Sequence, residues 1–292
     1  MKPTPPNCTT GPGKAVFVTG CSSGIGRAVA TRLAQAGYTV FASVRRAAQH
    51  EELASLGHPN LVPLSPLDLS TLHHIPPVVD KLHHELASRS INGLFAFVGN
   101  AGGGKPAPLE MIDPHMFLTE LHTRAVAPVA LLQELLPLIR QAKGRILWIV
   151  TPALIPTPYV ASIHAADFAV NCLARTLEIE LKPWNIPNIL IRCGGIKTPA
   201  GLRTTSDVEE LFRLSQSPSS DLYKQRLTRW ARDMASFDQK RTEPDKVAEV
   251  VLRALTSKSP RRRYSIGHLA WAAALLEALP QPVADTILKW RF

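Results

Sequence analysis

Short runs rich in β-branched and aromatic residues alternate with longer stretches of helical periodicity along most of the chain. The runs predicted to form strands are 15–19, 39–44, 61–69, 93–100, 145–150, 188–193 and 263–266. Helical spacing of apolar residues is clearest over 113–139 and 160–183. Because the strands are almost continuously apolar, both faces of their sheet must be covered, which is typical of parallel sheets. The alternation predicts an α/β fold with a doubly wound parallel sheet of about seven strands and helices on both faces.

A glycine-rich turn joins the first predicted strand to a helical stretch, 27–37. Glycines here let the backbone turn tightly and approach a pyrophosphate, whose charge the N-terminus of the next helix stabilises. The position between a strand and a helix is stronger evidence than the glycine spacing alone. The alternative is a merely tight strand–helix turn. We predict a Rossmann-type dinucleotide site formed by Gly20, Ser22, Ser23, Gly24, Ile25 and Gly26.

The second predicted strand is followed by Arg45 and Arg46. A site that prefers NAD places a carboxylate here on the ribose 2′-hydroxyl, whereas arginine suits the 2′-phosphate of NADP. The hydroxyl of Ser22 can donate to the same phosphate. The sequence therefore favours NADP(H) over NAD(H). The alternative is that both arginines are ordinary surface residues of a basic chain, which has 33 Lys and Arg against 23 Asp and Glu.

These residues resemble the short-chain dehydrogenase/reductase family over residues 14–292, and most of all its hydroxysteroid and retinol dehydrogenases. The glycine turn matches the family's cofactor loop, and the stretches 99–102, 193–198 and 262–267 resemble later family motifs. The resemblance implies that further cofactor-binding residues are Asp68, Leu69, Asn100, Ala101, Gly102, Ile196 and Thr198.

The resemblance breaks at the catalytic residues. The family uses a Tyr acid/base and a Lys four residues later, with an Asn that organises a water relay and a Ser that orients the substrate carbonyl. The register of the 160–183 helix puts Ile163 at the Tyr position and Asp167 at the Lys position. Arg124 falls at the Asn position, and Thr151 lies near the Ser position.

Arg124 and Asp167 carry opposite charges at positions that are close in the family's fold, so we predict a buried ion pair between them. The alternative is two solvated residues in a decayed pocket. His164 has a side chain suited to proton transfer, but it is offset by about 100° from Ile163 on the helix and can equally serve packing. Thr151 can donate to a carbonyl or satisfy only its own backbone. Thr151, Asp167, Arg124 and His164 are thus the candidate catalytic residues.

Two classes of function fit these observations. The first is NADP(H)-dependent reduction of a small hydrophobic carbonyl, enone or imine by non-standard residues, as in some biosynthetic pathways. An activated substrate such as an iminium ion or an enone needs no Tyr to protonate an alkoxide, because hydride transfer is the chemistry of the cofactor. The second is an inactive pseudo-oxidoreductase that binds NADP(H) as a structural or sensing ligand and acts through protein partners. In either case the resemblance implies a homodimer or homotetramer.

The chain is predicted to be a single Rossmann domain over 14–292, after a flexible Pro-rich leader over 1–13. The polar helical segment 199–243 stands where the family inserts a substrate lid, and 268–292 is predicted to form a C-terminal helical extension. Its apolar residues predict lid or dimer packing, with peripheral membrane contact as the alternative.

Composition excludes several other classes. The longest apolar run is far shorter than the roughly 20 residues of a membrane span, and no secretory signal is visible, so a cytoplasmic protein is expected. The four cysteines are widely spaced and the histidine doublets lack metal-ligand spacing, so free thiols and no metal site are predicted. The scattered basic residues form no aromatic-interleaved face, which argues against nucleic acid as a partner.

Overall fold

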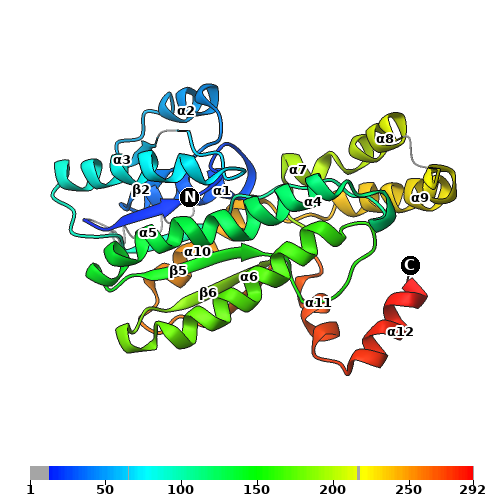
Figure 1. The fold of residues 1–292 in the computed structure, drawn as a ribbon. Coiled ribbons are helices and arrows are strands. Elements are labelled where there is room, and N and C mark those ends of the chain that lie inside the picture. Colours follow the sequence, from blue (N-terminus) through cyan, green and yellow to red (C-terminus); the bar gives the residue numbers. More distant parts are fainter. Residues whose placement is uncertain (1–12, 65, 216–217, 292) are drawn as a thin grey trace, which may run out of the picture.

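The computed structural model describes residues 13–64, 66–215 and 218–291. Seven parallel strands form one sheet in the order β3-β2-β1-β4-β5-β6-β7 (Figure 1). The strands are β1 (Ala15–Val18), β2 (Thr39–Ala42), β3 (Leu61–Pro63), β4 (Ala96–Gly99), β5 (Arg145–Val150), β6 (Asn188–Cys193) and β7 (Arg263–Ile266). The predicted doubly wound sheet is confirmed. The predicted leader 1–13 lies almost wholly outside the described residues.

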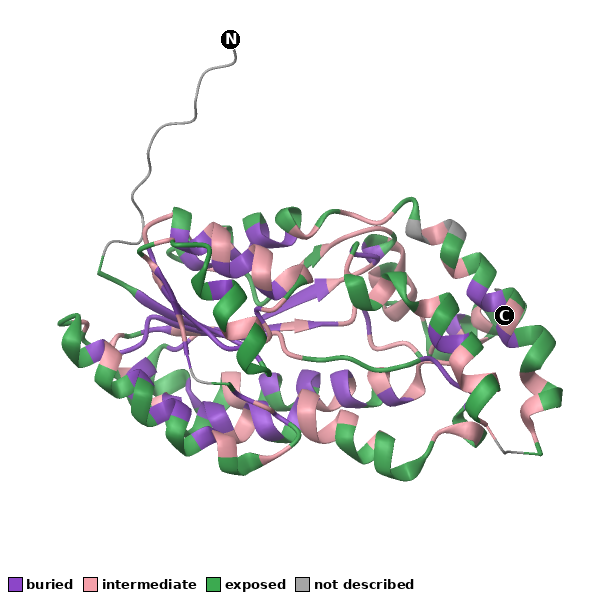
Figure 2. Cartoon of the chain, turned by 90° about the horizontal axis from the view of Figure 1, so that it is seen from above, coloured by how far each residue is buried: buried purple, intermediate pink, exposed green. Residues whose placement is uncertain are grey.

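Helices cover both faces of the sheet. The face with Phe17, Phe97 and Trp148 packs against α3 (Ile75–Ser88), α5 (Ala127–Gln141) and α6 (Ala161–Glu180). The opposite face packs against α1 (Gly24–Gln35), α2 (Ala47–Ala54) and α10 (Pro244–Thr256). Figure 2 shows the buried strands between helices whose outer faces are exposed. The short helices η1 (Leu72–His74), η2 (Leu109–Met111) and η4 (Lys182–Trp184) lie in the connections.

The third predicted strand, 61–69, was wrong beyond residue 63. The amides of Leu64 and Leu67 still donate to the carbonyls of Ala42 and Val44, at 3.0 and 2.8 Å, but without a continuous ladder. Pro63 has no N–H to offer, so a regular strand ends there. Asp68 and Leu69 therefore lie in a loop beyond the carboxyl edge of the sheet.

The prediction of one regular helix over 113–139 was wrong. It consists of α4 (Pro114–Leu121), a π-helical turn η3 (His122–Val126) and α5. Pro128 explains the turn: it cannot donate to the carbonyl of Arg124, and its ring would clash with that carbonyl in an α-helix. A π turn relieves the clash. Arg124 thus projects from an irregular turn.

The segment 199–243 is helical, as predicted, with α7 (Pro199–Leu202), α8 (Thr204–Leu214) and α9 (Ser220–Asp238). Val208, Leu227 and Trp230 bring α8 and α9 together, and the ring of Tyr159 packs on Trp230 with centroids 5.5 Å apart. Lys105 forms an ion pair with Glu210 of α8. These helices lie at the carboxyl ends of the strands (Figure 1). Their role as a substrate lid stays a prediction.

The C-terminal extension forms α11 (Ala270–Glu277) and α12 (Gln281–Arg291). Arg192 of β6, whose side chain is 3% exposed, pairs with Glu277 and donates to Asn171 Oδ1 at 3.3 Å. This buried charge anchors α11 to the sheet. Several apolar side chains of the extension are exposed, among them Trp271 and Trp290. No helix in the described part of the chain is long and apolar enough to cross a membrane.

Candidate cofactor and active site

The glycine turn packs directly against the start of α1. A Cβ at Gly26 would overlap the carbonyl oxygen of Gly20 and lie 2.5 Å from Asn100 Nδ2, so only glycine fits. Asn100 Nδ2 donates to the carbonyl of Thr19 at 2.9 Å and so holds the turn to the end of β4. The turn and the start of α1 are thus in close backbone contact, as the predicted pyrophosphate site requires.

Thr19 is a structural residue of this site that sequence reasoning missed. It is fully buried, and its Oγ1 accepts the N–H groups of Asn100 at 2.8 Å and Ala101 at 2.9 Å. Thr19 therefore ties the turn after β1 to the turn after β4. The available signal was a polar residue at the end of an apolar strand, immediately before the first glycine.

The adenine side of the predicted site is exposed and basic. Arg45 and Arg46 are exposed just beyond β2. Burial raises the pKa of Asp68, but hydrogen bonds from Ser70, one of them from its N–H at 2.9 Å, and the positive charge of Arg45 outweigh burial and lower it. Arg45 and Asp68 thus lie close together on the adenine side of the predicted site. No hydrogen bond of the Ser22 hydroxyl is found within the described residues, so it is available to a ligand.

On the predicted nicotinamide side, Ile196 is buried and Thr198 caps α7 by accepting the N–H of Gly201 at 3.1 Å. The Thr198 methyl group lies 3.1 Å from the Cβ position of Gly24. Thr198 therefore joins the glycine turn to the start of segment 199–243. Ser23, which precedes α1, makes no side-chain cap hydrogen bond to the N–H groups of that helix end.

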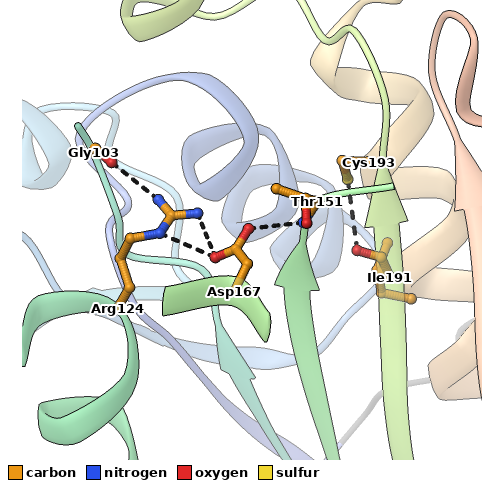
Figure 3. A network of polar contacts seen from close by, with 6 residues as sticks. All are labelled: Gly103, Arg124, Thr151, Asp167, Ile191 and Cys193. Atoms are coloured by element: carbon orange, nitrogen blue, oxygen red, sulfur yellow. Dashed lines mark hydrogen bonds and ion pairs between the residues drawn. The ribbon is translucent and has the colours of Figure 1, made fainter. Parts of the chain in front are cut away.

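The predicted ion pair between Arg124 and Asp167 is confirmed. Arg124 Nε and Nη2 both donate to Asp167 Oδ1, at 3.0 and 2.6 Å, and the two side chains are 15% and 3% exposed. Arg124 Nη1 donates to the carbonyl of Gly103 at 3.1 Å. Figure 3 shows this network between η3, α6 and the end of β5. Together with residues such as Ala101 and Trp148, the pair lines a small cavity beside the sheet.

Gly102 makes room for the Arg124 guanidinium, because a Cβ at that position would overlap Nη1. Its neighbour Gly103 has nothing within 4 Å of its Cβ position. The structure therefore assigns Gly102 a packing role under Arg124. Its contact with a cofactor stays a prediction.

Thr151 lies at the end of β5, beside the ion pair. Its backbone N–H donates to Asp167 Oδ2 at 2.8 Å, so the strand end and α6 are held together through the carboxylate. Its Oγ1 is shielded from solvent and has no hydrogen-bond partner within the described residues. A buried hydroxyl without a partner is unfavourable, so a ligand oxygen or nitrogen placed here would satisfy it.

His164 lies on the same helix as Asp167. Its Nδ1 is 3.1 Å from the carbonyl of Ile155, which fixes Nδ1 as the protonated nitrogen and leaves Nε2 as an acceptor in the neutral ring. Burial lowers the pKa of His164 and Arg124 adds to the effect, against the opposing influence of the Ile155 carbonyl and of Asp167. The lowered pKa favours the neutral ring and makes His164 a weaker base than an exposed histidine.

The sequence model of the short chain dehydrogenase family matches residues 14–209. This chain belongs to the short-chain dehydrogenase family. It is 27% identical over 256 residues to a 3-amino-tetrahydro-pyrrolizinone reductase of Xenorhabdus hominickii, covering 87% of both chains. It is also 26% identical over 287 residues to retinol dehydrogenase 5 of Mus musculus, covering 94% of this chain and 87% of the relative. A solved short-chain dehydrogenase from Streptomyces avermitilis has a TM-score of 0.74 at 20% identity, covering 95% and 96% of the two chains.

These relatives confirm the resemblance to the short-chain dehydrogenases, retinol dehydrogenases included, and the family consists of oxidoreductases. Helix α6 of this member contains neither tyrosine nor lysine. The nearest tyrosine, Tyr159, precedes the helix with a φ of 67° and packs its ring on Trp230. It therefore belongs to the packing of segment 199–243.

Two cysteines near the site are not poised as nucleophiles. Burial, together with the negative charge of Asp167, raises the pKa of Cys193 to about 12. Burial also raises the pKa of Cys21, which lies in the glycine turn. Both thiols are therefore protonated at neutral pH. Cys21, Cys172 and Cys193 are free, while Cys8 lies outside the described residues.

Proposed function

We propose that this protein is an NADP(H)-dependent reductase of small hydrophobic compounds with a polarised C=O or C=N bond. The observation that carries the proposal is the buried Thr151 hydroxyl without a partner, next to the Arg124–Asp167 pair. A hydroxyl in this state is free to donate to a substrate heteroatom or to turn its oxygen toward a positively charged group. It would perform the orienting role of the family's serine. The reductase from X. hominickii among the relatives supports the reductive direction.

The residues present fit a dinucleotide. The glycine turn and the N-terminus of α1 would hold the pyrophosphate, Asp68 would accept from the adenine amine, and Asn100 would fix the turn beneath. Ile196 would border the nicotinamide. NADPH, when bound, supplies the hydride. The remaining chemistry is orientation of the substrate and stabilisation of the charge that develops on it.

The Arg124–Asp167 pair acts in this proposal as a positioning device. All three guanidinium nitrogens of Arg124 already donate to protein oxygens, and both carboxylate oxygens of Asp167 accept hydrogen bonds. Both side chains are therefore engaged by protein groups. By holding the backbone of Thr151, Asp167 sets the direction of the Thr151 hydroxyl. His164 borders the pair with Nε2 as an acceptor.

We expect Thr151→Val to lower kcat/KM for a hydrophobic aldehyde or imine about 10- to 100-fold, which corresponds to the loss of one hydrogen bond in the transition state. Because the hydroxyl has no protein partner, the free energy of unfolding should stay the same or rise. The measurement is NADPH oxidation followed at saturating cofactor, together with urea unfolding. A retained rate would contradict the role of Thr151. A complete lack of turnover by the wild-type protein on a carbonyl and imine panel would favour the pseudo-oxidoreductase.

We expect Arg45→Ala to weaken NADPH binding about 10-fold or more while the affinity for NADH changes little, since the side chain would pair only with the 2′-phosphate. Arg45 has no ion pair with a described residue, so the fold should be unaffected. Calorimetric titration with both nucleotides measures the effect. The matched control is Arg89→Ala, which removes an exposed cation directly after α3 that pairs with Glu85 one turn earlier. Equal weakening for both nucleotides would assign Arg45 another role.

Self-association and peripheral membrane contact remain proposals. The exposed Ile179 of α6 and Val126 beside α5 are consistent with a subunit interface on these helices. The exposed Trp271 and Trp290 of the C-terminal extension are consistent with packing against another surface.

A further inference from the structure

A second carboxylate, Glu120, borders the proposed substrate site and takes no part in the arrangement described above. It lies in the last turn of α4, one turn before Arg124. Its Oε1 is 2.9 Å from the Cβ position of Gly104. Its Oε2 is shielded from solvent and has no hydrogen-bond partner within the described residues. The carboxylate is thus half-buried with one oxygen unsatisfied.

The surroundings of Glu120 place it at the reaction centre of the proposed function. The side chain of Ile163 meets the same Gly104 position, with its Cδ1 2.8 Å away. Ile163 stands where the family's acid/base tyrosine is expected. The carboxylate of Glu120 therefore lies beside the place from which other family members deliver a proton.

The charges around Glu120 do not cancel. Arg124 is the nearest cation along the helix, but all three of its guanidinium nitrogens are directed at Asp167 and Gly103. No salt bridge of Glu120 is found within the described residues. Since the Arg124–Asp167 pair is neutral as a unit, it offers no net positive charge to the carboxylate of Glu120. A shielded carboxylate oxygen without a donor is unfavourable, and a bound cation would relieve it.

We propose that Glu120 makes the site specific for a hydrophobic cation, and that the reducible group is an iminium ion. The inference rests on the proposed reductase function and narrows its substrate class. Glu120 is a specificity determinant here, because the carboxylate would pair with the positive C=N group. A neutral ketone of the same size would gain nothing from this contact.

Reduction of an iminium ion is also compatible with the absence of tyrosine and lysine from α6. Its carbon accepts a hydride from the reduced nicotinamide, a new C–H bond forms, and the π electron pair of C=N moves to nitrogen. The substrate is reduced to a neutral amine while the nicotinamide is oxidised, so no proton is required. A ketone would leave an alkoxide that must be protonated. The lack of tyrosine and lysine on α6 is therefore compatible with turnover.

The test compares two probes of similar shape in calorimetric titrations with NADP⁺ present: the N-methyl dihydroisoquinolinium ion and the neutral ketone tetralone. We expect the wild-type protein to bind the cation at least about 10-fold more tightly, as one charge-assisted contact allows. Glu120→Gln should remove this preference without weakening tetralone. Glu134→Gln, which changes an exposed carboxylate of α5 with the same net charge effect, should leave both affinities unchanged.

Other outcomes separate the inference from the function on which it rests. Equal affinities for both probes, or an equal loss of both in Glu120→Gln, would overturn the role of Glu120. Reduction of the N-methyl dihydroisoquinolinium ion at an unchanged rate in that variant would support the reductase and reject the cation site. Glu120-dependent binding of the cation without NADPH oxidation would support the cation site and reject the reductase. If Glu120→Gln does not fold, Glu120→Asp should keep the preference for the cation, and its loss there would count against the inference.

Discussion

Asp167→Ala should lower the free energy of unfolding by about 3 kcal/mol, as measured by urea denaturation at pH 7. The side chain of Asp167 is 3% exposed, and its two oxygens accept from Arg124 and from the backbone of Thr151. Removing it leaves the guanidinium, itself only 15% exposed, without its counter-charge. Asp167→Asn keeps the shape of the side chain but not its charge, so its free energy of unfolding should lie between those of the wild-type protein and Asp167→Ala.

Two further variants test whether burial of the charge is the cause. The pair Lys197–Glu243 has side chains 51% and 59% exposed, so Glu243→Gln should cost less than about 1 kcal/mol. The double variant Arg124→Met with Asp167→Leu should recover much of the stability lost in Asp167→Ala, because no unpaired charge remains. A loss below about 1 kcal/mol for Asp167→Ala would show that the pair is solvated in solution.

Gly26→Ala should reduce the affinity for NADPH at least about 100-fold, the second large effect that we expect. The added methyl group would overlap the carbonyl oxygen of Gly20 and approach Asn100 Nδ2 at 2.5 Å. Because the group that the methyl would overlap is a backbone carbonyl, which cannot rotate away like a side chain, the clash is removed only if the turn moves away from the start of α1. The movement would separate the N–H groups that the phosphates need. Calorimetric titration with NADPH measures the change.

Gly103→Ala is the matched control, because nothing lies within 4 Å of its Cβ position and its carbonyl to Arg124 is kept. Its NADPH affinity should equal that of the wild-type protein. Thermal unfolding of both variants shows whether the glycine turn alone has changed. Unaltered NADPH binding by Gly26→Ala would mean that this turn does not hold the nucleotide.

Local pattern was sufficient for the fold and for the position of the cofactor loop. The alternation of apolar runs and helical stretches predicted the seven-stranded sheet, because strands buried on both faces are short continuous apolar runs and their covering helices have apolar residues at helical spacing. The glycine turn was also visible, since close backbone packing allows only glycine at Gly26. The ion pair of Arg124 and Asp167 was predicted by comparing two distant positions through the family register, and local pattern alone would not have found it.

Several features depend on groups that meet across long sequence separations. Gly102 gives space to Arg124, Arg192 of β6 binds Glu277 of α11, and Thr19 accepts from Asn100. The π turn at Arg124 could have been predicted from Pro128, but the helix propensities of the neighbouring residues favour one continuous helix. Likewise, the orphaned oxygen of Glu120 follows from its neighbours and not from its own segment.

The sheet, its helices and the glycine turn thus follow from patterns within short stretches of sequence, because the backbone geometry of strands and helices repeats at that scale. Which charges are paired and which hydroxyl is unsatisfied follow from the packing of η3 and α6 against the end of β5 (Figure 3). Those contacts join residues more than 15 positions apart, from Thr151 to Asp167 and from Arg124 to Asp167. Electrostatics and desolvation act through space, so the chemistry of this site emerges only when the chain is folded.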